Sequence, residues 1–393
     1  MGNSRIAYVC GQRQIHVLEP DGQHIPQTVA AEGDLMWGSW QAQVSEVVAH
    51  SWPTWSPDGK SIACFRMPAS GAPRVLITQV NGIESTEFVD LGVQLPIYLY
   101  WSPTGNQLAI LTQQLGQDGD KLGLLTLRAD ATGSTRSIAE GTPLFFTWFG
   151  ERIAAFVGKD THQASTLSVI DPTGRIPTQV LPGVPGNFCA PVALENHILY
   201  VAHYNGASRI LRARCDDPTP QCIETVDGLV GLVASPDRSL VARAVAPGGD
   251  GTAYRNLALI DSASGETRNI VDLPCLGFFW TPDNSALMTV SVDTSRNLMT
   301  WARVTLDGDI DPIAEMIPTR DYGFYLRFFE QYSQSHPIID PTSQHFLACG
   351  EMLGELGSSN KASVWTVPLN GSKPTEVAEG VFAVYSHQNP PGS

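Results

Sequence analysis

The sequence predicts an all-β fold, a β-propeller built from four-stranded blades. The first observation is a short phrase that recurs along the chain: an anchor residue, usually Trp, then Ser-Pro-Asp-Gly or a variant, then small apolar residues. The second is that several short apolar runs separated by turn residues follow most copies. A fixed period of this size is typical of repeat architectures, and four short strands per repeat indicate a propeller blade. The copies begin at Trp55, Trp101, Trp148, Ala234, Trp280 and Ile339.

The elements of one blade can be followed through the second copy. An apolar run at 97–100 leads into the anchor Trp101, and a turn at 102–105 follows. In such a turn Pro presets φ, Asp or its substitute bonds the local backbone, and Gly accepts positive φ. Further apolar runs at 107–111 and 122–127 predict the second and third strands, and a short fourth run closes the unit.

The spacing of the anchors sets the number of blades. Successive anchors lie 46 (55 to 101), 47 (101 to 148), 46 (234 to 280) and 59 (280 to 339) residues apart, and the gap from 148 to 234 has room for one weak copy without Trp. Apolar runs at 6–10 and 381–386 predict that both chain ends contribute to one shared blade, which removes an open sheet edge. The count is then eight blades. Seven is the alternative, if the weak fourth or seventh copy is not a full blade.

The anchor phrase resembles the TolB-type repeat (PD40, WD40-like), which also occurs in the propellers of prolyl oligopeptidase and dipeptidyl-peptidase-like proteins. The resemblance covers nearly the whole chain and implies one propeller domain over 1–393. The chain departs from the family pattern in two respects. No Gly-x-Ser-x-Gly elbow is present and the chain ends at Ser393, so peptidase activity is not expected. TolB has a separate N-terminal domain and a leader, and neither is expected here.

Composition restricts the functional classes. The chain of 393 residues has a formal net charge of −15 and a pI of about 4.9, which disfavours binding to nucleic acid through phosphate contacts. No run approaches the roughly 18 apolar residues of a membrane span. The first six residues show no leader, so we expect a cytoplasmic protein; a periplasmic or extracellular location stays open if a leader has been removed.

Sequence motifs support no cofactor or metal. The nine His residues are scattered. Asp307–Asp311 imitates the start of a calcium loop, but Pro312 and Pro318 stand where the loop needs Gly and Glu, so a hairpin turn is predicted. The odd total of seven Cys argues against a disulfide framework. One bond between Cys215 and Cys222 stays open.

The segment 318–336 lengthens the spacing before the last anchor and predicts an insertion at one face of the propeller. Its aromatic residues 325, 328, 329 and 332 fall at helical spacing, which favours burial against the propeller. The other interpretation is a lid or recognition element. The predicted binding site consists of two groups of residues. The polar residues of the segment are Arg320, Asp321, Arg327, Glu330 and His336, and the residues that begin innermost strands are His50, Trp52 and Tyr98.

Two functions remain. The first is a non-catalytic binding or scaffolding protein that holds a protein or peptide partner through one face and the insertion. The second is an enzyme, a lyase, hydrolase or cyclase, with a small-molecule site at the mouth of the central channel. The enzyme would need clustered acid–base groups, for which His50, Asp321, Arg327, Glu330 and His336 are the candidates.

Overall fold

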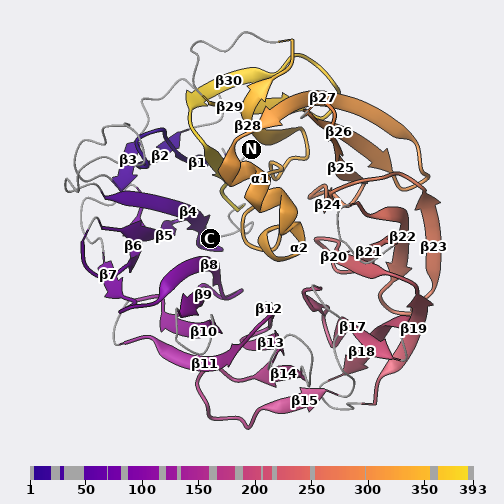
Figure 1. The fold of residues 1–393 in the computed structure, drawn as a ribbon, viewed down its shortest axis with the longest axis horizontal. Helices are drawn as coiled ribbons and strands as arrows, with labels where there is room; N and C mark the ends of the chain where they lie inside the picture. Colours follow the sequence, from indigo (N-terminus) through magenta and orange to yellow (C-terminus); the bar gives the residue numbers. More distant parts are fainter. Residues whose placement is uncertain are drawn as a thin grey trace. The chain divides into compact units, whose positions relative to one another are not determined.

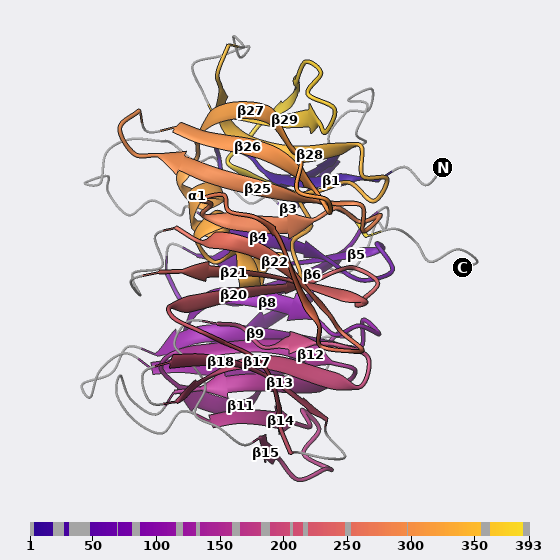
Figure 2. The same ribbon diagram turned by 90° about the vertical axis from the view of Figure 1, so that its right-hand side faces the viewer.

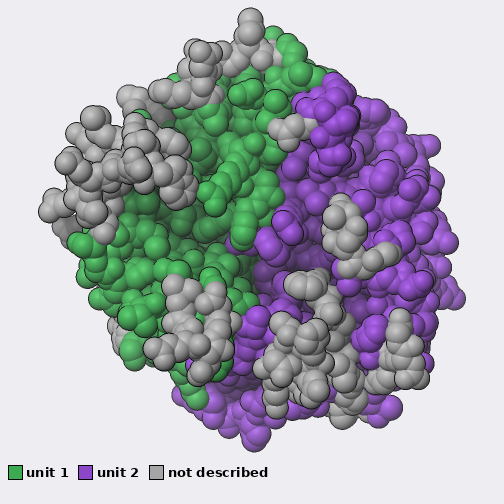
Figure 3. Space-filling model, viewed as in Figure 1, with its two compact units in different colours: residues 1–137, 314–324, 335–393 green, residues 138–313, 325–334 purple. Residues whose placement is uncertain are grey.

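The fold is taken from a computed structural model. It describes residues 4–18, 27–30, 48–68, 70–80, 87–114, 121–130, 134–158, 166–181, 189–204, 207–214, 219–247, 253–296, 298–354 and 362–387. The described residues form antiparallel sheets and two short helices, which confirms the predicted all-β class (Figure 1). The chain divides into two compact units, shown in green and purple in Figure 3. Unit 1 comprises residues 1–137, 314–324 and 335–393, and unit 2 comprises residues 138–313 and 325–334.

Unit 1 contains three four-stranded sheets and the end of a larger sheet. In the first, the strand nearest the C-terminus pairs with the strand nearest the N-terminus, as predicted for a blade shared between the chain ends. Its strands are β1 (Ile6–Val9), β2 (Ile15–Leu18), β3 (Gln27–Ala30) and β31 (Phe382–Tyr385). The second has β4 (Ala49–Trp55), β5 (Ser61–Met67), β6 (Arg74–Gln79) and β7 (Glu87–Asp90). The third has β8 (Leu95–Trp101), β9 (Gln107–Gln114), β10 (Lys121–Arg128) and β11 (Arg136–Gly141), whose residues 138–141 belong to unit 2. The last strands are β28 (His345–Met352), β29 (Ser363–Pro368) and β30 (Thr375–Glu379).

Unit 2 contains three further four-stranded sheets and the beginning of the larger sheet; Figures 1 and 2 show the labelled strands from two directions. The first two sheets are β12 (Leu144–Phe149), β13 (Arg152–Val157), β14 (Thr166–Ile170) and β15 (Gln179–Leu181), then β16 (Val192–Ala193), β17 (His197–Tyr204), β18 (Ala207–Arg214) and β19 (Gln221–Val226). The others are β20 (Leu229–Ala234), β21 (Leu240–Ala246), β22 (Arg255–Asp261) and β23 (Thr267–Val271), then β24 (Gly277–Trp280), β25 (Ala286–Asp293), β26 (Leu298–Thr305) and β27 (Ile310–Pro318), whose residues 314–318 belong to unit 1.

The recurring turn is held by hydrogen bonds inside the phrase itself. In the first copy Ser56 Oγ donates to Asp58 at 2.6 Å and accepts the backbone N–H of Ser61 at 2.9 Å, while Gly59 has φ +66°. Four further copies have an equivalent of Ser56. In each, its side-chain oxygen accepts the backbone N–H of the residue five positions later. These acceptors are Ser102, Ser235, Thr281 and Asp340. The phrase therefore closes its hairpin without help from distant residues.

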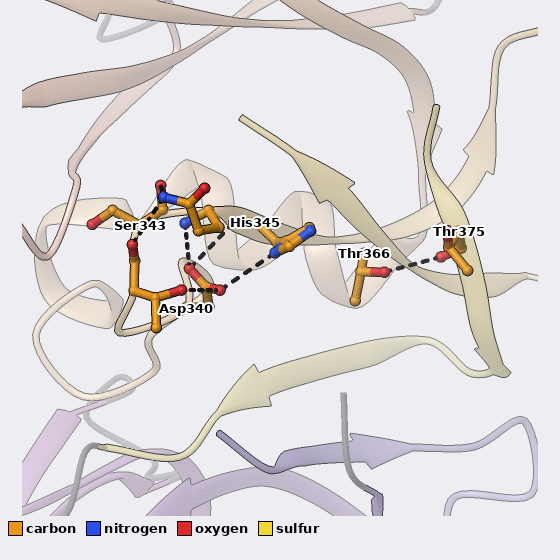
Figure 4. Close-up of polar contacts among 7 residues, drawn as sticks. Asp340, Ser343, His345, Thr366 and Thr375 are labelled. Atoms are coloured by element: carbon orange, nitrogen blue, oxygen red, sulfur yellow. Dashed lines mark hydrogen bonds and ion pairs between the residues drawn. The ribbon is translucent and has the colours of Figure 1, made fainter. Parts of the chain in front are cut away.

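The last copy shows how the turn tolerates substitution (Figure 4). Asp340 replaces Ser, and its carboxylate accepts the N–H groups of Gln344 at 2.7 Å and His345 at 3.2 Å. Ser343, with φ +56°, occupies the left-handed position that Gly takes in the first copy. The innermost strand of this copy is reduced to a single bridge between Ile339 and Phe346. The repeat is thus preserved at the turn and shortened before it.

The anchor Trp connects consecutive sheets within a unit. In unit 1 Trp101 Nε1 donates to the backbone oxygen of Thr54, at 3.2 Å, and in unit 2 Trp280 Nε1 donates to that of Val233, at 3.0 Å. Each acceptor directly precedes the anchor position of the previous copy. Both Trp rings are buried, so an indole both fills the space between sheets and satisfies a strand carbonyl.

Two further predictions can be compared with the structure. The copy between 148 and 234 does form a four-stranded sheet, β16 to β19. The 307–311 segment is a hairpin turn, with Thr305 N–H bonded to Asp309 O at 2.9 Å, as predicted. Cys215 lies outside the described residues, so the Cys215–Cys222 bond stays a hypothesis. The blade number and the single domain over 1–393 also stay predictions.

Candidate functional site

The predicted insertion forms two helices, α1 (Arg320–Arg327) and α2 (Phe329–Tyr332), drawn in orange in Figure 1. Three residues of its aromatic stripe are almost completely buried in unit 2: Tyr325, Phe329 and Tyr332. Phe328 is half-buried. Helical spacing therefore predicted burial correctly, and this stripe is part of the core of unit 2.

α2 is attached to the innermost strands of unit 2 through its polar side chains as well. The Gln331 side-chain amide bonds both backbone groups of Phe146 in β12, accepting the N–H at 3.0 Å and donating to the oxygen at 2.7 Å. An amide that pairs with a strand residue in this way takes the place of a neighbouring strand. Gln334 adds a bond to Thr147 Oγ1 and donates to Glu330 O at 2.8 Å.

Glu330 is the most perturbed carboxyl group of unit 2. It is 8% exposed and accepts hydrogen bonds from Tyr254 Oη at 3.0 Å and from Ala190 N at 3.2 Å. Burial raises the pKa of Glu330 to about 8, while the bonds from Tyr254, Ala190 and Cys189 oppose that rise. The carboxyl is therefore mostly protonated at pH 7.

Glycines in the innermost strands make room for α2. A Cβ on Gly231 would lie 3.0 Å from Glu330 Oε1 and 3.0 Å from Tyr254 Cε1, and one on Gly277 would lie 3.0 Å from the Phe329 ring. Phe329 packs there against Phe278, with ring centroids 4.9 Å apart. Residues 325–334 are thus a structural plug of unit 2, fitted to strands that lack side chains at the points of contact.

In unit 1 the insertion ends in a buried hydrogen-bonded cluster. Ser335 Oγ lies 2.6 Å from Tyr98 Oη and 2.7 Å from His336 Nδ1, and Thr54 Oγ1 donates to Ser335 O at 2.8 Å. The side chains of Tyr98 and His336 are fully buried. Burial lowers the pKa of His336 to about 3, so its imidazole is neutral at physiological pH.

Trp52 is held in an unusual backbone conformation. Its φ is +53°, the left-handed region that bulky residues rarely adopt, and the register of β4 against β5 shifts between Ser51 and Thr54. The ring packs against Phe382 with centroids 4.8 Å apart and against Phe324 of α1 at 5.7 Å. A bulge thus turns this Trp toward α1.

A second left-handed residue, Arg13 with φ +62°, lies beside the same strand. Its backbone oxygen accepts the N–H of His50 at 2.8 Å, and its guanidinium forms an ion pair with Asp321 at the start of α1. The Arg13 and Asp321 side chains are 29% and 19% exposed. This pair fixes the first turn of α1 in unit 1.

α1 has a buried and an exposed side. Tyr322, Tyr325 and Leu326 are fully buried, and Tyr322 Oη donates to Leu347 O at 2.6 Å. Thr319 caps the helix by accepting the N–H of Tyr322 at 3.1 Å. The exposed positions are Arg320, Phe324 and Arg327, three residues spaced i, i+4 and i+7; we call them the α1 face. Phe324 is 40% exposed.

The predicted site residues therefore differ in exposure and do not form one cluster. His50, Tyr98, Glu330 and His336 are buried, Trp52 and Asp321 are partly exposed, and Arg320 and Arg327 are exposed. In unit 1 Trp52, Tyr98 and His336 share one aromatic cluster, whereas Glu330 belongs to the core of unit 2. A role in binding stays a prediction for all eight.

Sequence reasoning missed Phe324 and Arg13. Phe324 lies outside the aromatic stripe, and its position four residues after Arg320 was the signal that could have placed it on the exposed side. No sequence signal brings Arg13 to residue 321, because that pairing spans 308 residues.

Two possible features have no counterpart in the part of the chain that the structure describes. No group of three or more His, Cys, Asp and Glu side chains there could hold a metal ion. No helix there has the length and apolar character needed to cross a membrane.

Comparisons with known proteins identify the fold. No family model and no curated protein match the chain. Among solved structures it is similar to a eukaryotic initiation factor, with a TM-score of 0.58 and 12% identity over 100% of both chains. It is also similar to the β-propeller domain of the Trilobed protease from Pyrococcus furiosus, with a TM-score of 0.51 and 12% identity over 85% of this chain and 98% of that domain. The chain is therefore a β-propeller protein.

TolB from Acinetobacter baumannii is also among the similar structures, with a TM-score of 0.41 and 14% identity over 78% of this chain. The chain spans only 62% of that TolB. A score this low carries no argument of its own, and the assignment to the PD40 family stays a prediction. At these identities the likenesses show the fold alone.

Proposed function

We propose that this β-propeller protein is a non-catalytic binding protein that holds a protein or peptide partner on the α1 face. The observation that carries the proposal is the exposure of Phe324. Tyr322 and Tyr325, its aromatic neighbours on α1, are fully buried, whereas Phe324 is 40% exposed between two exposed Arg residues. Aromatic residues and Arg are the types enriched at protein interfaces and among their energetically dominant residues.

Hydrogen bonds and an ion pair support this face from beneath. The Thr319 cap, the bond from Tyr322 to Leu347 and the ion pair of Asp321 with Arg13 hold the helix from three directions in unit 1. A surface that is ordered before binding loses less conformational entropy when a partner arrives. Trp52, held in a strained conformation against Phe324, fits the same interpretation, since strain tends to gather at functional sites.

Burial argues against the enzyme alternative at three of its five candidate groups. A general acid or base must reach the proton that it transfers. His50 is 1% exposed and His336 is fully buried, and the neutral His336 imidazole bonds Ser335 inside unit 1. Glu330 is buried in unit 2 with both oxygens hydrogen-bonded. These groups have structural partners, and the fold itself favours neither function, because propellers host both binding and catalysis.

The test is recovery of a partner from native lysate with point variants. Deleting 318–336 would remove the buried plug and unfold unit 2, so Phe324→Ala is compared with the intact chain. Ile176→Ala, at a residue 55% exposed in unit 2, is the matched control. We expect a partner captured by the intact chain and by the control to be lost with Phe324→Ala, while circular dichroism shows all three folded. Equal capture by all three would refute the proposal.

A further inference from the structure

The α1 face carries positive charge in an acidic protein. The chain has 24 Lys and Arg against 39 Asp and Glu, yet Arg320 and Arg327 lie on either side of Phe324 on one side of one helix. Among the residues that the structure describes, neither Arg forms an ion pair. The only carboxylate of α1, Asp321, is already paired with Arg13. Among the charges on α1 itself, two positive ones are therefore not offset.

Helix stability does not account for both of these cations. Arg327 lies in the last turn, where the helix dipole favours a cation, but Arg320 begins the helix, where the dipole disfavours one. The buried side of α1 is attached by Tyr322, Tyr325 and Leu326, so neither Arg is needed for packing. An exposed cation at an unfavourable end of a helix is therefore consistent with selection for an external anion.

Resting on the proposed function, we infer that the partner segment is acidic and places two carboxylates on Arg320 and Arg327 with an apolar side chain on Phe324. Guanidinium groups bind carboxylates through paired, charge-assisted hydrogen bonds. The rest of the acidic chain opposes this little, because salt screens charges beyond about 8 Å at physiological ionic strength.

Helix geometry gives the spacing of the partner's acidic residues. Seven residues at about 1.5 Å each separate the two Arg positions by about 10 Å along the axis. An extended peptide covers that distance in about three residues at about 3.3 Å each. Side chains three positions apart in an extended peptide point to opposite faces, so the two carboxylates that meet α1 lie four positions apart, with an apolar residue midway that faces the same way.

The probe is a fluorescein-labelled extended peptide with two Glu residues four positions apart and one Leu midway between them, on a Gly/Ser background. The control peptide has Gln in place of both Glu. Fluorescence anisotropy would compare the intact chain with Arg320→Glu, Arg327→Glu and Phe324→Ala. Arg175→Glu, an exposed residue of unit 2, makes the same change of charge away from α1. Arg320→Gln and Arg327→Gln repeat the test without charge reversal, should reversal disturb the helix.

We expect the acidic peptide to bind the intact chain and Arg175→Glu at least about 10-fold more tightly than the control peptide. Each Arg variant of α1 should lose that preference, and Phe324→Ala should bind both peptides more weakly. No preference for the acidic peptide, or a preference kept by the Arg variants, overturns the inference. Tighter binding of a DNA oligonucleotide of equal charge overturns it too.

The lysate capture separates the two ideas. If the captured partner is lost with Phe324→Ala but retained by both Arg variants, the proposed function stands and the inference that the partner segment is acidic is wrong. If Phe324→Ala retains the partner, the proposed function itself fails.

Discussion

Replacing Glu330 with Gln tests whether the plug of unit 2 is held by a protonated carboxyl. Gln has nearly the same shape as a neutral Glu and keeps an oxygen that can accept from Tyr254 or Ala190, but it does not titrate. The folded protein holds the pKa of Glu330 at about 8, against 4.5 for an ordinary Glu. Folding therefore takes up a proton at this residue between those two pH values.

The sign and size of the effect follow from this difference in pKa. Below pH 4.5 the residue is protonated in both states and the stability it contributes is fully present. As the pH rises toward 8 only the unfolded state loses the proton, so the free energy of unfolding falls by about 1.4 kcal/mol per pH unit and then levels off. The total loss is about 5 kcal/mol.

Urea unfolding followed by tryptophan fluorescence between pH 4.5 and 9 would measure the effect. We expect the stability of Glu330→Gln relative to the intact chain to increase across this range and to level off near pH 8. Glu351→Gln, at an exposed strand residue, is the control and should parallel the intact chain. If Glu330→Gln keeps the pH dependence of the intact chain, the hypothesis that a protonated Glu330 carboxyl holds the plug is wrong.

Two further substitutions test the repeat. Trp280→Phe removes the indole N–H and leaves the buried oxygen of Val233 without its donor. The free energy of unfolding, measured by urea titration, should therefore fall by about 1–3 kcal/mol. If it does not fall, the Trp acts by packing alone. Arg238 has φ +60° at the turn position where the first copy has Gly59. Arg238→Gly should relieve about 1 kcal/mol of backbone strain and so raise the thermal midpoint of unfolding. A lower midpoint would contradict this interpretation.

The parts of the fold that could be predicted are those set by neighbouring residues. The turn at Ser56 is closed by bonds two and five residues along the chain, so the phrase specifies its own hairpin wherever it occurs. Helical spacing likewise predicted that Tyr325, Phe329 and Tyr332 would be buried, because one side of a helix collects residues three or four apart.

The candidate site was harder to predict because its residues acquire their properties from distant partners. Glu330 belongs to a residue type usually found at the surface, yet the fold buries it beside partners 140 and 76 positions away, and this burial raises its pKa. His336 looked like a possible acid–base group, but its burial beside Tyr98 lowers its pKa and makes it structural.

The sequence by itself determined a propeller of repeated hairpins, the shared sheet of the two chain ends and the position of the helical insertion. Only the tertiary structure decided which residues of that insertion meet solvent. Periodicity shows that a helix has two sides, but the side that is buried depends on where distant strands provide room, as Gly231 and Gly277 do for α2. The exposure of Phe324 between Arg320 and Arg327 is a result of that packing.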